Sequence, residues 1–363
     1  MTNISYTNKM EICNVCGGKE FTAFARRSDN LEVLMCQHCG MGVLELFPND
    51  TSKFYDDSYY ENSDRNVVAG YSDYDVSSTH GVLWASELVK LAKGSGRVLD
   101  VGCANGFLLN ELGNGYEIYG IEANAKAAKV AESVGARIIG NDILGPELLL
   151  NYSGYFDVIT AIAVFEHIKD FKGSIEASLQ MLKPNGILIF EVPLVSESNN
   201  NDTWFNSSLE HLYYPTIKGM RHLFEIQLKT PMIGGELVIH DYASTFVGIA
   251  TRDDSTFTGI KTLYDRLLFT VPTNLSREER RAQLLLKVIH AADPDPDLIS
   301  FLFELFSSSK QTPFIFRCLD LWKSDSLRLQ SAKNYLKEVE AAKEWHFLNS
   351  ERWRLAFEEC KAG

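Results

Sequence analysis

The 363-residue sequence contains no apolar run long enough for a membrane-spanning helix, which needs about 18 consecutive apolar residues. The first six residues also lack the charged and apolar regions of a secretory signal. Positive charge is scarce, because 35 Lys and Arg residues face 48 Asp and Glu residues, a formal net charge of −13. Contacts to nucleic acid phosphates require a basic surface, so this balance argues against nucleic acid as the main partner. We therefore expect a cytoplasmic protein without a transmembrane segment.

The cysteines are too few and too unevenly spaced for a disulfide framework. Their number is odd, seven, and four of them form the tight pairs Cys13-x-x-Cys16 and Cys36-x-x-Cys39, which fits a reducing compartment better. Each pair can present two thiolates from a tight turn, and four thiolates form the closed tetrahedral site of structural zinc. The sequence thus predicts a zinc module over residues 1–50, with two buried or disulfide-bonded pairs as the alternative.

Changes of composition divide the rest of the chain into three parts. Residues 51–79 are rich in tyrosine and have no regular period, which indicates a linker. Residues 80–251 alternate apolar runs with helical patterns, and residues 252–363 are mainly helical and charged. Near-heptad spacing over 332–356 fits either a helix docked on the body or a short coiled coil that binds a protein partner or a second copy of the chain.

The alternating part predicts a parallel sheet. Its apolar runs predict strands at 97–102, 117–122, 137–139, 156–162 and 186–192. Helices between these strands imply right-handed crossovers, and later segments near 237–240 and 245–249 could close the sheet with antiparallel strands. The expected fold class is a doubly wound, Rossmann-like α/β sheet with an N-terminal four-cysteine zinc ribbon and a C-terminal helical region.

The turn after the first strand of this sheet has the features of a cofactor site. In Asp100-Val-Gly102-Cys-Ala104-Asn-Gly106 the glycines leave the backbone open to a ligand, at the strand end where open α/β sheets bind ligands. Glu122 ends the second strand, where a carboxylate can accept both ribose hydroxyls. An NAD site is less suitable, since Ala104 occupies the position of the second glycine in G-x-G-x-x-G. After the third strand, Asp142 can bond an adenine amine while Ile143 packs on the ring.

With these residues the sequence resembles the class I S-adenosylmethionine-dependent methyltransferases. The resemblance covers roughly residues 80–195 and consists of five motifs in order, at 98–107, 120–122, 141–143, 163–168 and 182–186. It implies that Gly102 holds the methionine moiety, in a loop that includes Asp100 and Gly106. It also implies that Glu122 binds the ribose and that Asp142 and Ile143 bind the adenine. It further implies that the Glu166-His167 pair lines the cofactor or substrate mouth, although such a pair can also cap a helix.

The zinc ribbon, the Tyr-rich linker and this core together resemble bacterial methyltransferases of sugar nucleotides and surface polysaccharides. Among them, zinc-ribbon sugar C-methyltransferases carry a segment similar to Glu210-His211-Leu-Tyr213-Tyr. The resemblance implies His211 as the general base, Tyr213 as a substrate contact and Glu210 as the residue that tunes the imidazole. A structural histidine is the alternative. Linker tyrosines, among them Tyr59, Tyr60, Tyr71 and Tyr74, would close over the cofactor or simply pack against the sheet edge.

The acceptor is less defined than the donor. The C-methylating enzymes have a larger second α/β domain, which this chain lacks, so O-methylation of a sugar in a surface glycan or sugar nucleotide is the leading hypothesis. The alternatives are C-methylation of a keto-deoxysugar nucleotide, RNA methylation with the ribbon as the reader, small-molecule methylation outside sugars, and a non-catalytic binding subunit that keeps the fold.

Overall fold

The computed structural model describes residues 5–7, 9–51, 54–55, 59, 85–86, 88–90, 92–195, 208–237 and 245–267. The chain divides into two units, one of residues 1–237 and 242–261 and the other of residues 238–241 and 262–363. Within the described ranges no helix combines the length and the apolar character needed to span a membrane. The linker tyrosines Tyr60, Tyr71 and Tyr74 and the predicted coiled coil over 332–356 lie outside the described residues.

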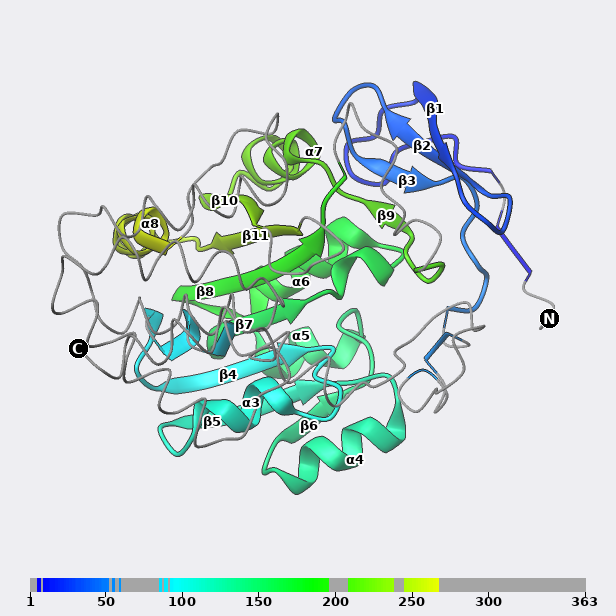
Figure 1. The fold of residues 1–363 in the computed structure, drawn as a ribbon. Coiled ribbons are helices and arrows are strands. Elements are labelled where there is room, and N and C mark those ends of the chain that lie inside the picture. The colour runs from blue at the N-terminus through cyan, green and yellow to red at the C-terminus, as the bar shows by residue number, and fades with distance from the viewer. Residues whose placement is uncertain are drawn as a thin grey trace, which may run out of the picture. The chain divides into compact units, whose positions relative to one another are not determined.

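A seven-stranded sheet forms the centre of the first unit, in the order β10-β11-β8-β7-β4-β5-β6 (Figure 1). Its strands are β4 (Gly96–Val101), β5 (Tyr116–Ile121), β6 (Arg137–Gly140), β7 (Phe156–Ile162), β8 (Leu182–Pro193), β10 (Met232–Leu237) and β11 (Thr245–Ala250). Strands β4 to β8 pair in parallel, and β11 pairs antiparallel with both β8 and β10. The doubly wound sheet is therefore confirmed, and the strand expected at 237–240 lies earlier, at 232–237.

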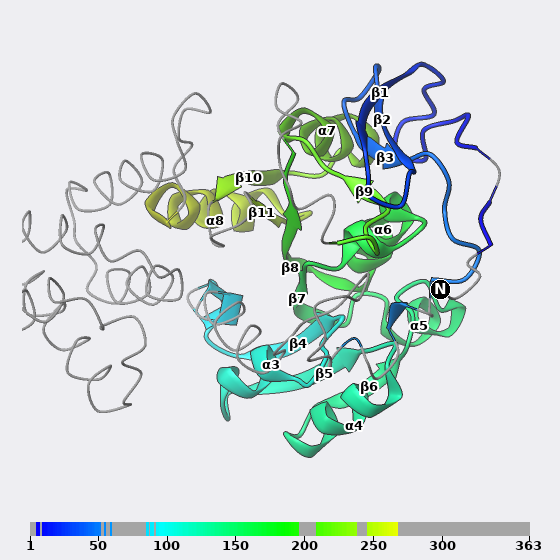
Figure 2. The same ribbon diagram turned by 45° about the vertical axis from the view of Figure 1, so that its right-hand side comes forward.

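The chain leaves the sheet centre in both directions, which covers both faces with helices. From β4 it winds outward to β5 and β6, then crosses to β7 and winds the other way to β8. Right-handed crossovers consequently place α3 (Phe107–Leu112) and α4 (Ala125–Ser133) on one face, and α5 (Pro146–Tyr152) and α6 (Phe171–Met181) on the other (Figure 2). The position where the winding reverses, between β4 and β7, is where such sheets bind ligands.

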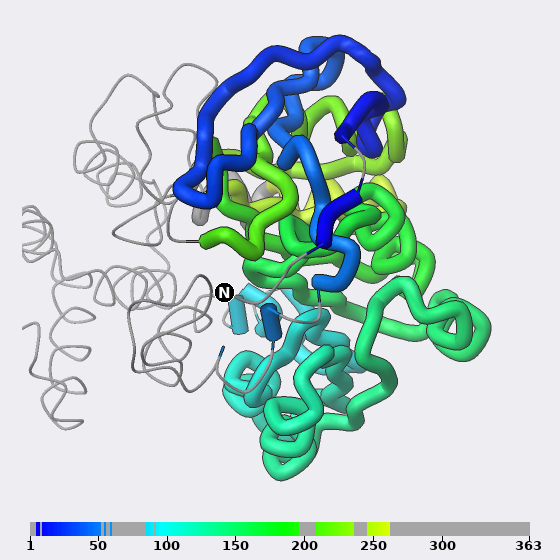
Figure 3. Tube along the Cα trace, turned by 90° about the vertical axis from the view of Figure 1, so that its right-hand side faces the viewer, coloured from blue at the N-terminus to red at the C-terminus, as the bar shows by residue number. Residues whose placement is uncertain are grey.

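A second sheet joins the N-terminal ribbon to the body of the unit. Its order is β1-β2-β3-β9, formed by β1 (Phe21–Arg26), β2 (Glu32–Cys36), β3 (Gly42–Leu44) and β9 (Tyr213–Tyr214). Strand β9 follows β8 by about twenty residues, yet it pairs antiparallel with β3, with Val43 opposite Tyr213. Figure 3 shows the blue ribbon strands beside the green segment that carries β9. The segment that contains the predicted catalytic histidine therefore supplies one strand of the ribbon sheet.

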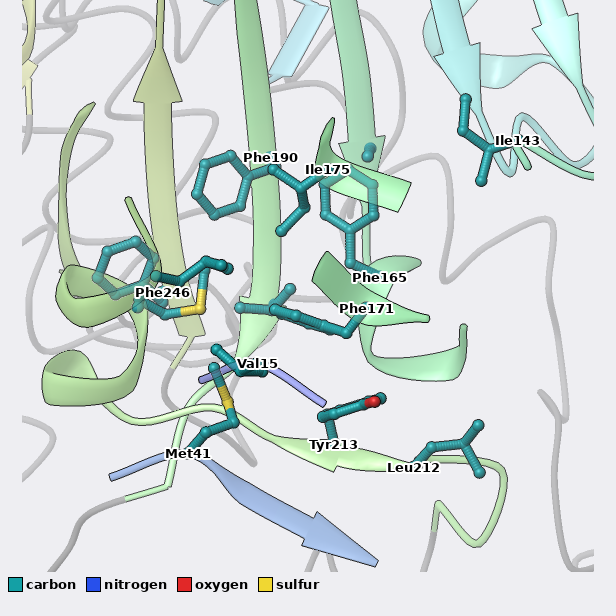
Figure 4. Packing of buried hydrophobic residues seen from close by; sticks show 14 of the residues in the cluster. Val15, Met41, Ile143, Phe165, Phe171, Ile175, Phe190, Leu212, Tyr213 and Phe246 are labelled. Atoms are coloured by element: carbon teal, nitrogen blue, oxygen red, sulfur yellow. The ribbon is translucent and has the colours of Figure 1, made fainter. Parts of the chain in front are cut away.

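One hydrophobic core continues from the ribbon into the sheet. Val15 and Met41 of the ribbon are 1% and 0% exposed and belong to the same cluster as Phe171 and Tyr213 (Figure 4). Tyr213 packs against Phe47 of the ribbon and Phe171 of α6, with ring centroids 5.6 Å and 4.9 Å apart. Buried aromatic side chains contribute much of the energy of protein cores and interfaces, so these contacts hold the ribbon and the sheet together.

Candidate active site

A cavity of about 650 Å³ opens at the carboxyl ends of β4, β5, β6 and β7. Its wall includes the predicted cofactor residues Gly102, Glu122, Asp142 and Ile143. Tyr55 and Tyr59 from the Tyr-rich segment also line it, and their rings make an edge contact at 5.1 Å. The volume is within the range of small-molecule sites, and the lining combines apolar surface with a few polar groups.

The loop after β4 has an unusual backbone. Gly102, Ala104 and Gly106 have φ values of 68°, 46° and 79°, all in the left-handed region. A Cβ on Gly102 would lie 2.6 Å from Val164 Cγ2, so only glycine fits this position beside the cavity. Ala104 adopts the left-handed conformation at the place where a dinucleotide-binding loop has glycine, at a cost of roughly 1–2 kcal/mol. Non-glycine residues in that region concentrate at functional sites.

Glu122 stabilises this loop as well as lining the cavity. Its Oε2 accepts a hydrogen bond from the Ala104 amide at 2.8 Å, and its Oε1 accepts one from the Asn124 amide at 2.8 Å. The carboxylate is 5% exposed. Glu122 therefore has a structural task at the cavity that its position in the sequence did not indicate, in addition to the predicted ribose contact.

The remaining predicted cofactor residues occupy different positions. Asp142 accepts the Leu144 amide at 2.9 Å through one oxygen, and Ile143, 2% exposed, packs beside it. Asp100 is buried under the loop and accepts a hydrogen bond from the Thr160 hydroxyl at 2.6 Å; burial raises its pKa to about 7. Asp100 and Gly106 are not on the cavity wall, so they support the loop from behind.

A cluster of histidines and a carboxylate adjoins the cavity. His167 lies on the cavity wall, and its ring is 4.7 Å from that of His211, 44 residues later in the chain. Glu166 Oε1 is 3.3 Å from His167 Nε2 and 3.9 Å from His211 Nε2. The sequence indicated Glu166 and His211 separately, but it did not indicate that His167 and His211 face each other.

Burial and neighbouring charges determine the protonation of the two histidines. Burial alone would lower the pKa of His167, but the adjacent Glu166 carboxylate outweighs it and raises that pKa above 6.5. Burial, followed by the charges of His167 and Arg27, lowers the pKa of His211 well below 6.5. His211 is therefore neutral near pH 7 and can accept a proton or bind a cation.

Two further carboxylates, Glu191 and Glu210, are buried near this cluster. Burial and then the charge of Glu166 raise the pKa of Glu191 to about 8. Burial raises the pKa of Glu210 above 4.5, and the charge of His167 opposes that shift. Glu210 was predicted to tune the imidazole of His211. In the structure the Glu166 carboxylate lies 3.9 Å from His211, and Glu210 interacts electrostatically with His167.

Comparison with known proteins identifies the domain that contains the cavity. Residues 80–227 match a family model described as a methyltransferase domain. These residues form a methyltransferase domain. The resemblance inferred from the sequence motifs is confirmed to this extent.

Individual relatives cover only part of the chain. Two ubiquinone biosynthesis O-methyltransferases, from Bordetella avium and Pseudomonas putida, are 30% and 32% identical over 112 and 114 residues, which is 30% of this chain and 46% and 48% of theirs. The chain thus spans about half the length of the curated relatives it matches. A solved methyltransferase from Thermotoga maritima, titled a possible histamine N-methyltransferase, is 15% identical with a TM-score of 0.38, over 48% of this chain and 92% of the other.

A buried arginine of the ribbon holds the loop that places His211 beside Glu166. Arg27, 4% exposed, donates hydrogen bonds to the backbone oxygens of Leu209 and His211 at 2.8 and 2.9 Å. It also donates to the Tyr214 hydroxyl at 3.0 Å and pairs with Asp29. From the other side, the Leu212 amide donates to the Glu166 carbonyl at 2.9 Å. The ribbon therefore sets the position of His211 relative to Glu166.

We expect Arg27→Lys to lower the turnover number at least tenfold and to leave S-adenosylmethionine affinity unchanged. Lysine keeps the charge but cannot donate in several fixed directions as the guanidinium fork does, so the loop of His211 would shift. The measurement is the turnover number together with cofactor titration by calorimetry. The neighbouring Arg26→Lys is the matched control, since Arg26 is exposed and only pairs with Glu32 at the surface. Equal turnover for both variants would refute this role of Arg27.

Tyr213 takes a different position from the one expected of a substrate contact. It is 1% exposed, its hydroxyl donates to the Lys169 carbonyl at 2.7 Å, and it accepts a hydrogen bond from Asn14 Nδ2 at 3.1 Å. Its side chain is not on the cavity wall. The geometry favours a structural role for Tyr213 between the ribbon and the methyltransferase domain, and its predicted contact with substrate remains a prediction.

The four cysteines of the ribbon converge on one point. The Sγ atoms of Cys13, Cys16, Cys36 and Cys39 all lie within 4.8 Å of one another, and none of the four cysteines is in a disulfide. The Cys13–Cys39 and Cys16–Cys36 distances are 3.7 and 3.6 Å. Zinc–sulfur bonds of about 2.3 Å in a tetrahedron place the sulfurs about 3.8 Å apart. The Gly18 and Met41 amides also point at Cys16 and Cys39 Sγ. The geometry fits a structural zinc ion.

Proposed function

We propose that the protein transfers a methyl group from S-adenosylmethionine to a hydroxyl oxygen of a sugar, in a sugar nucleotide or a surface glycan. The observation that carries the proposal is the position of His167 on the wall of the cofactor cavity, in contact with His211 and Glu166. A methyl acceptor that enters this cavity would meet proton-accepting groups at the end where the donor methyl is held.

The cofactor would lie along the carboxyl ends of the strands. Glu122 would bind the ribose, Asp142 and Ile143 the adenine, and the backbone at Gly102 the methionine part. When bound, S-adenosylmethionine supplies an electrophilic methyl group on a positively charged sulfur. Tyr55 and Tyr59 would cover the cavity and exclude water, which would otherwise compete for the acceptor oxygen.

The chain's own contribution is to make the acceptor oxygen nucleophilic. His211 is neutral and can take the hydroxyl proton, either directly or through His167. Glu166 stabilises the positive charge that then develops on the imidazole pair. Acid–base groups placed in this way contribute typically about 10²–10⁴-fold to a rate.

A phenolic hydroxyl is the second candidate acceptor. It is favoured by the curated relatives, which are named ubiquinone biosynthesis O-methyltransferases. The same proton-accepting cluster would act on a phenol, whose hydroxyl is more acidic than that of a sugar. The relatives match 30% of this chain and less than half of their own length, whereas the resemblance of the zinc ribbon and the segment around His211 to sugar methyltransferases favours a sugar acceptor.

Mass spectrometry of reactions with S-adenosylmethionine distinguishes these acceptors. Separate reactions contain a panel of sugar nucleotides, isolated surface glycan, polyprenylated catechols and bulk RNA. We expect one added methyl on a sugar nucleotide or glycan, with base-stable linkage to oxygen in the fragment spectrum. Methylation of the catechols alone would replace the proposal by the second candidate, and methylation of RNA alone would overturn both.

We also propose that the ribbon binds one structural zinc ion. Removal of zinc by a chelator is expected to lower the melting temperature of the protein and to reduce methyl transfer, because structural zinc binding is coupled to folding and β9 belongs to the ribbon sheet. Metal analysis should find the zinc lost in Cys16→Ser and kept in Cys103→Ser, whose cysteine lies outside the group. A wild-type protein that contains no zinc and melts normally would refute the zinc site.

A further inference from the structure

Glu166 is a fully buried carboxylate without a hydrogen bond. Its side chain is 0% exposed, and neither oxygen accepts a hydrogen bond from any described residue. His167 Nε2 lies 3.3 Å from Glu166 Oε1, which is near enough for charge attraction. An ionised carboxylate left in this state is costly, since burial removes its hydration without replacement. Glu166 therefore has an electrostatic partner in His167, whose pKa it raises, but no hydrogen bond from a described residue that would replace its hydration.

The atoms around Glu166 are those of a metal site. One ligand atom each from Glu166, His167 and His211 can be chosen so that all three lie within 4.8 Å of one another. Two of the separations, from Glu166 Oε1 to the Nε2 atoms of His167 and His211, are 3.3 and 3.9 Å. Ligands bound at about 2.0–2.2 Å to one tetrahedral ion are roughly 3.4 Å apart, so small side-chain rotations would complete the site.

The charge of the surroundings also favours a cation. Glu191 and Glu210 interact electrostatically with Glu166, and both are almost fully buried, at 2% and 6% exposure. Arg27 is the cation that acts on this region from the ribbon, and it is already paired with Asp29. Three carboxylates thus share a buried space with two imidazoles. A divalent ion would stabilise the ionised forms of these carboxyl groups.

We propose that Glu166, His167 and His211 bind a divalent transition-metal ion beside the cofactor cavity. Two histidines and one carboxylate are a ligand set of metal ions that keep coordination positions open for substrate. His167 lies on the cavity wall, so the open positions face the cavity. As a role in catalysis, which rests on the proposed function and takes the place of proton acceptance by His211, the ion would bind the acceptor oxygen and lower the pKa of its hydroxyl, whose proton would pass to solvent before methyl transfer.

Mn²⁺ is a suitable probe because it prefers oxygen and nitrogen ligands and binds poorly to a four-thiolate site. The experiment determines the metal content of the purified protein by mass spectrometry, and then titrates Mn²⁺ and counts the bound ion by electron paramagnetic resonance. The metal content of the purified protein and the Mn²⁺ bound on titration are added for each variant. This sum is expected to be one divalent ion per chain higher for the wild type than for Glu166→Gln. Mn²⁺ should also raise the melting temperature of the wild type but not that of Glu166→Gln.

The matched control is Glu147→Gln, the same chemical change at an exposed residue of α5 that is not on the cavity wall. It should bind as much metal as the wild type. His211→Asn is a second variant with an expected loss of the same ion, and cofactor titration verifies that each variant is folded. Equal metal binding by wild type, Glu166→Gln and His211→Asn would overturn the metal site. Methyl transfer to a sugar without that ion would leave the proposed function intact, whereas metal binding without transfer would overturn only the proposed function.

Discussion

Gly102→Val is expected to weaken S-adenosylmethionine binding at least about 100-fold, which corresponds to about 2.8 kcal/mol. The first atom of the new side chain would already lie 2.6 Å from Val164 Cγ2, well inside the contact distance of about 3.5–4.0 Å. Since Gly102 and Val164 both line the cavity, relief of this clash would move the loop into the space of the cofactor. Isothermal calorimetry with S-adenosylmethionine measures the effect.

Gly154→Val separates this clash from backbone strain. Gly154 has φ of +65°, similar to the +68° of Gly102, but no atom lies within 4 Å of its added Cβ and it is not on the cavity wall. Both variants therefore bear the left-handed cost of roughly 1–2 kcal/mol in stability. Only Gly102→Val should lose the cofactor. Wild-type affinity in that variant would show that the cofactor binds elsewhere.

His211→Ala should lower the turnover number roughly 10²–10⁴-fold while the dissociation constant of S-adenosylmethionine changes little. The imidazole is buried at 8% exposure beside His167 and Glu166, whereas Glu122, Asp142 and the Gly102 loop remain unaltered. The measurement pairs single-turnover methyl transfer with cofactor calorimetry. A turnover number equal to that of the wild type would remove His211 from the mechanism.

His222→Ala is a useful companion to this variant. The ring of His222 contacts Gln227 and His38 and is not on the cavity wall, so its loss should leave turnover almost unchanged. A similar decrease for both variants would indicate that a lost histidine destabilises this side of the domain, and that His211 has no chemical role.

Local patterns in the sequence were sufficient to predict the central sheet. Continuous apolar runs at 156–162 and 117–122 correspond to β7 and β5 within one residue, since strands buried on both faces need such runs. The first of the helices expected between the strands is α3. Antiparallel closure by β11 was also predicted, whereas β10 begins five residues earlier than expected because Gly234 and Gly235 interrupt its apolar pattern.

The long-range contacts of the site could not be predicted from local patterns. Arg27 and His211 are 184 residues apart, and nothing near Arg27 distinguishes it from its exposed neighbour Arg26. Strand β9 has only two residues, too few for a period to be detected. The resemblance indicated that Glu166 and His167 line the cavity mouth, but the contact of His167 with His211 joins residues that are 44 positions apart in the sequence.

Pairing of β3 with β9 makes the unfolding of the ribbon and of the His211 loop a single event. The Leu44 amide of β3 donates a hydrogen bond to the Leu212 carbonyl at 2.8 Å. The Leu212 amide in turn donates to the Glu166 carbonyl. Opening of the ribbon would therefore break the restraint on both sides of the loop. In hydrogen exchange, the amides of Leu44 and Leu212 should open with the same free energy, and the ribbon would not be a separate foldon.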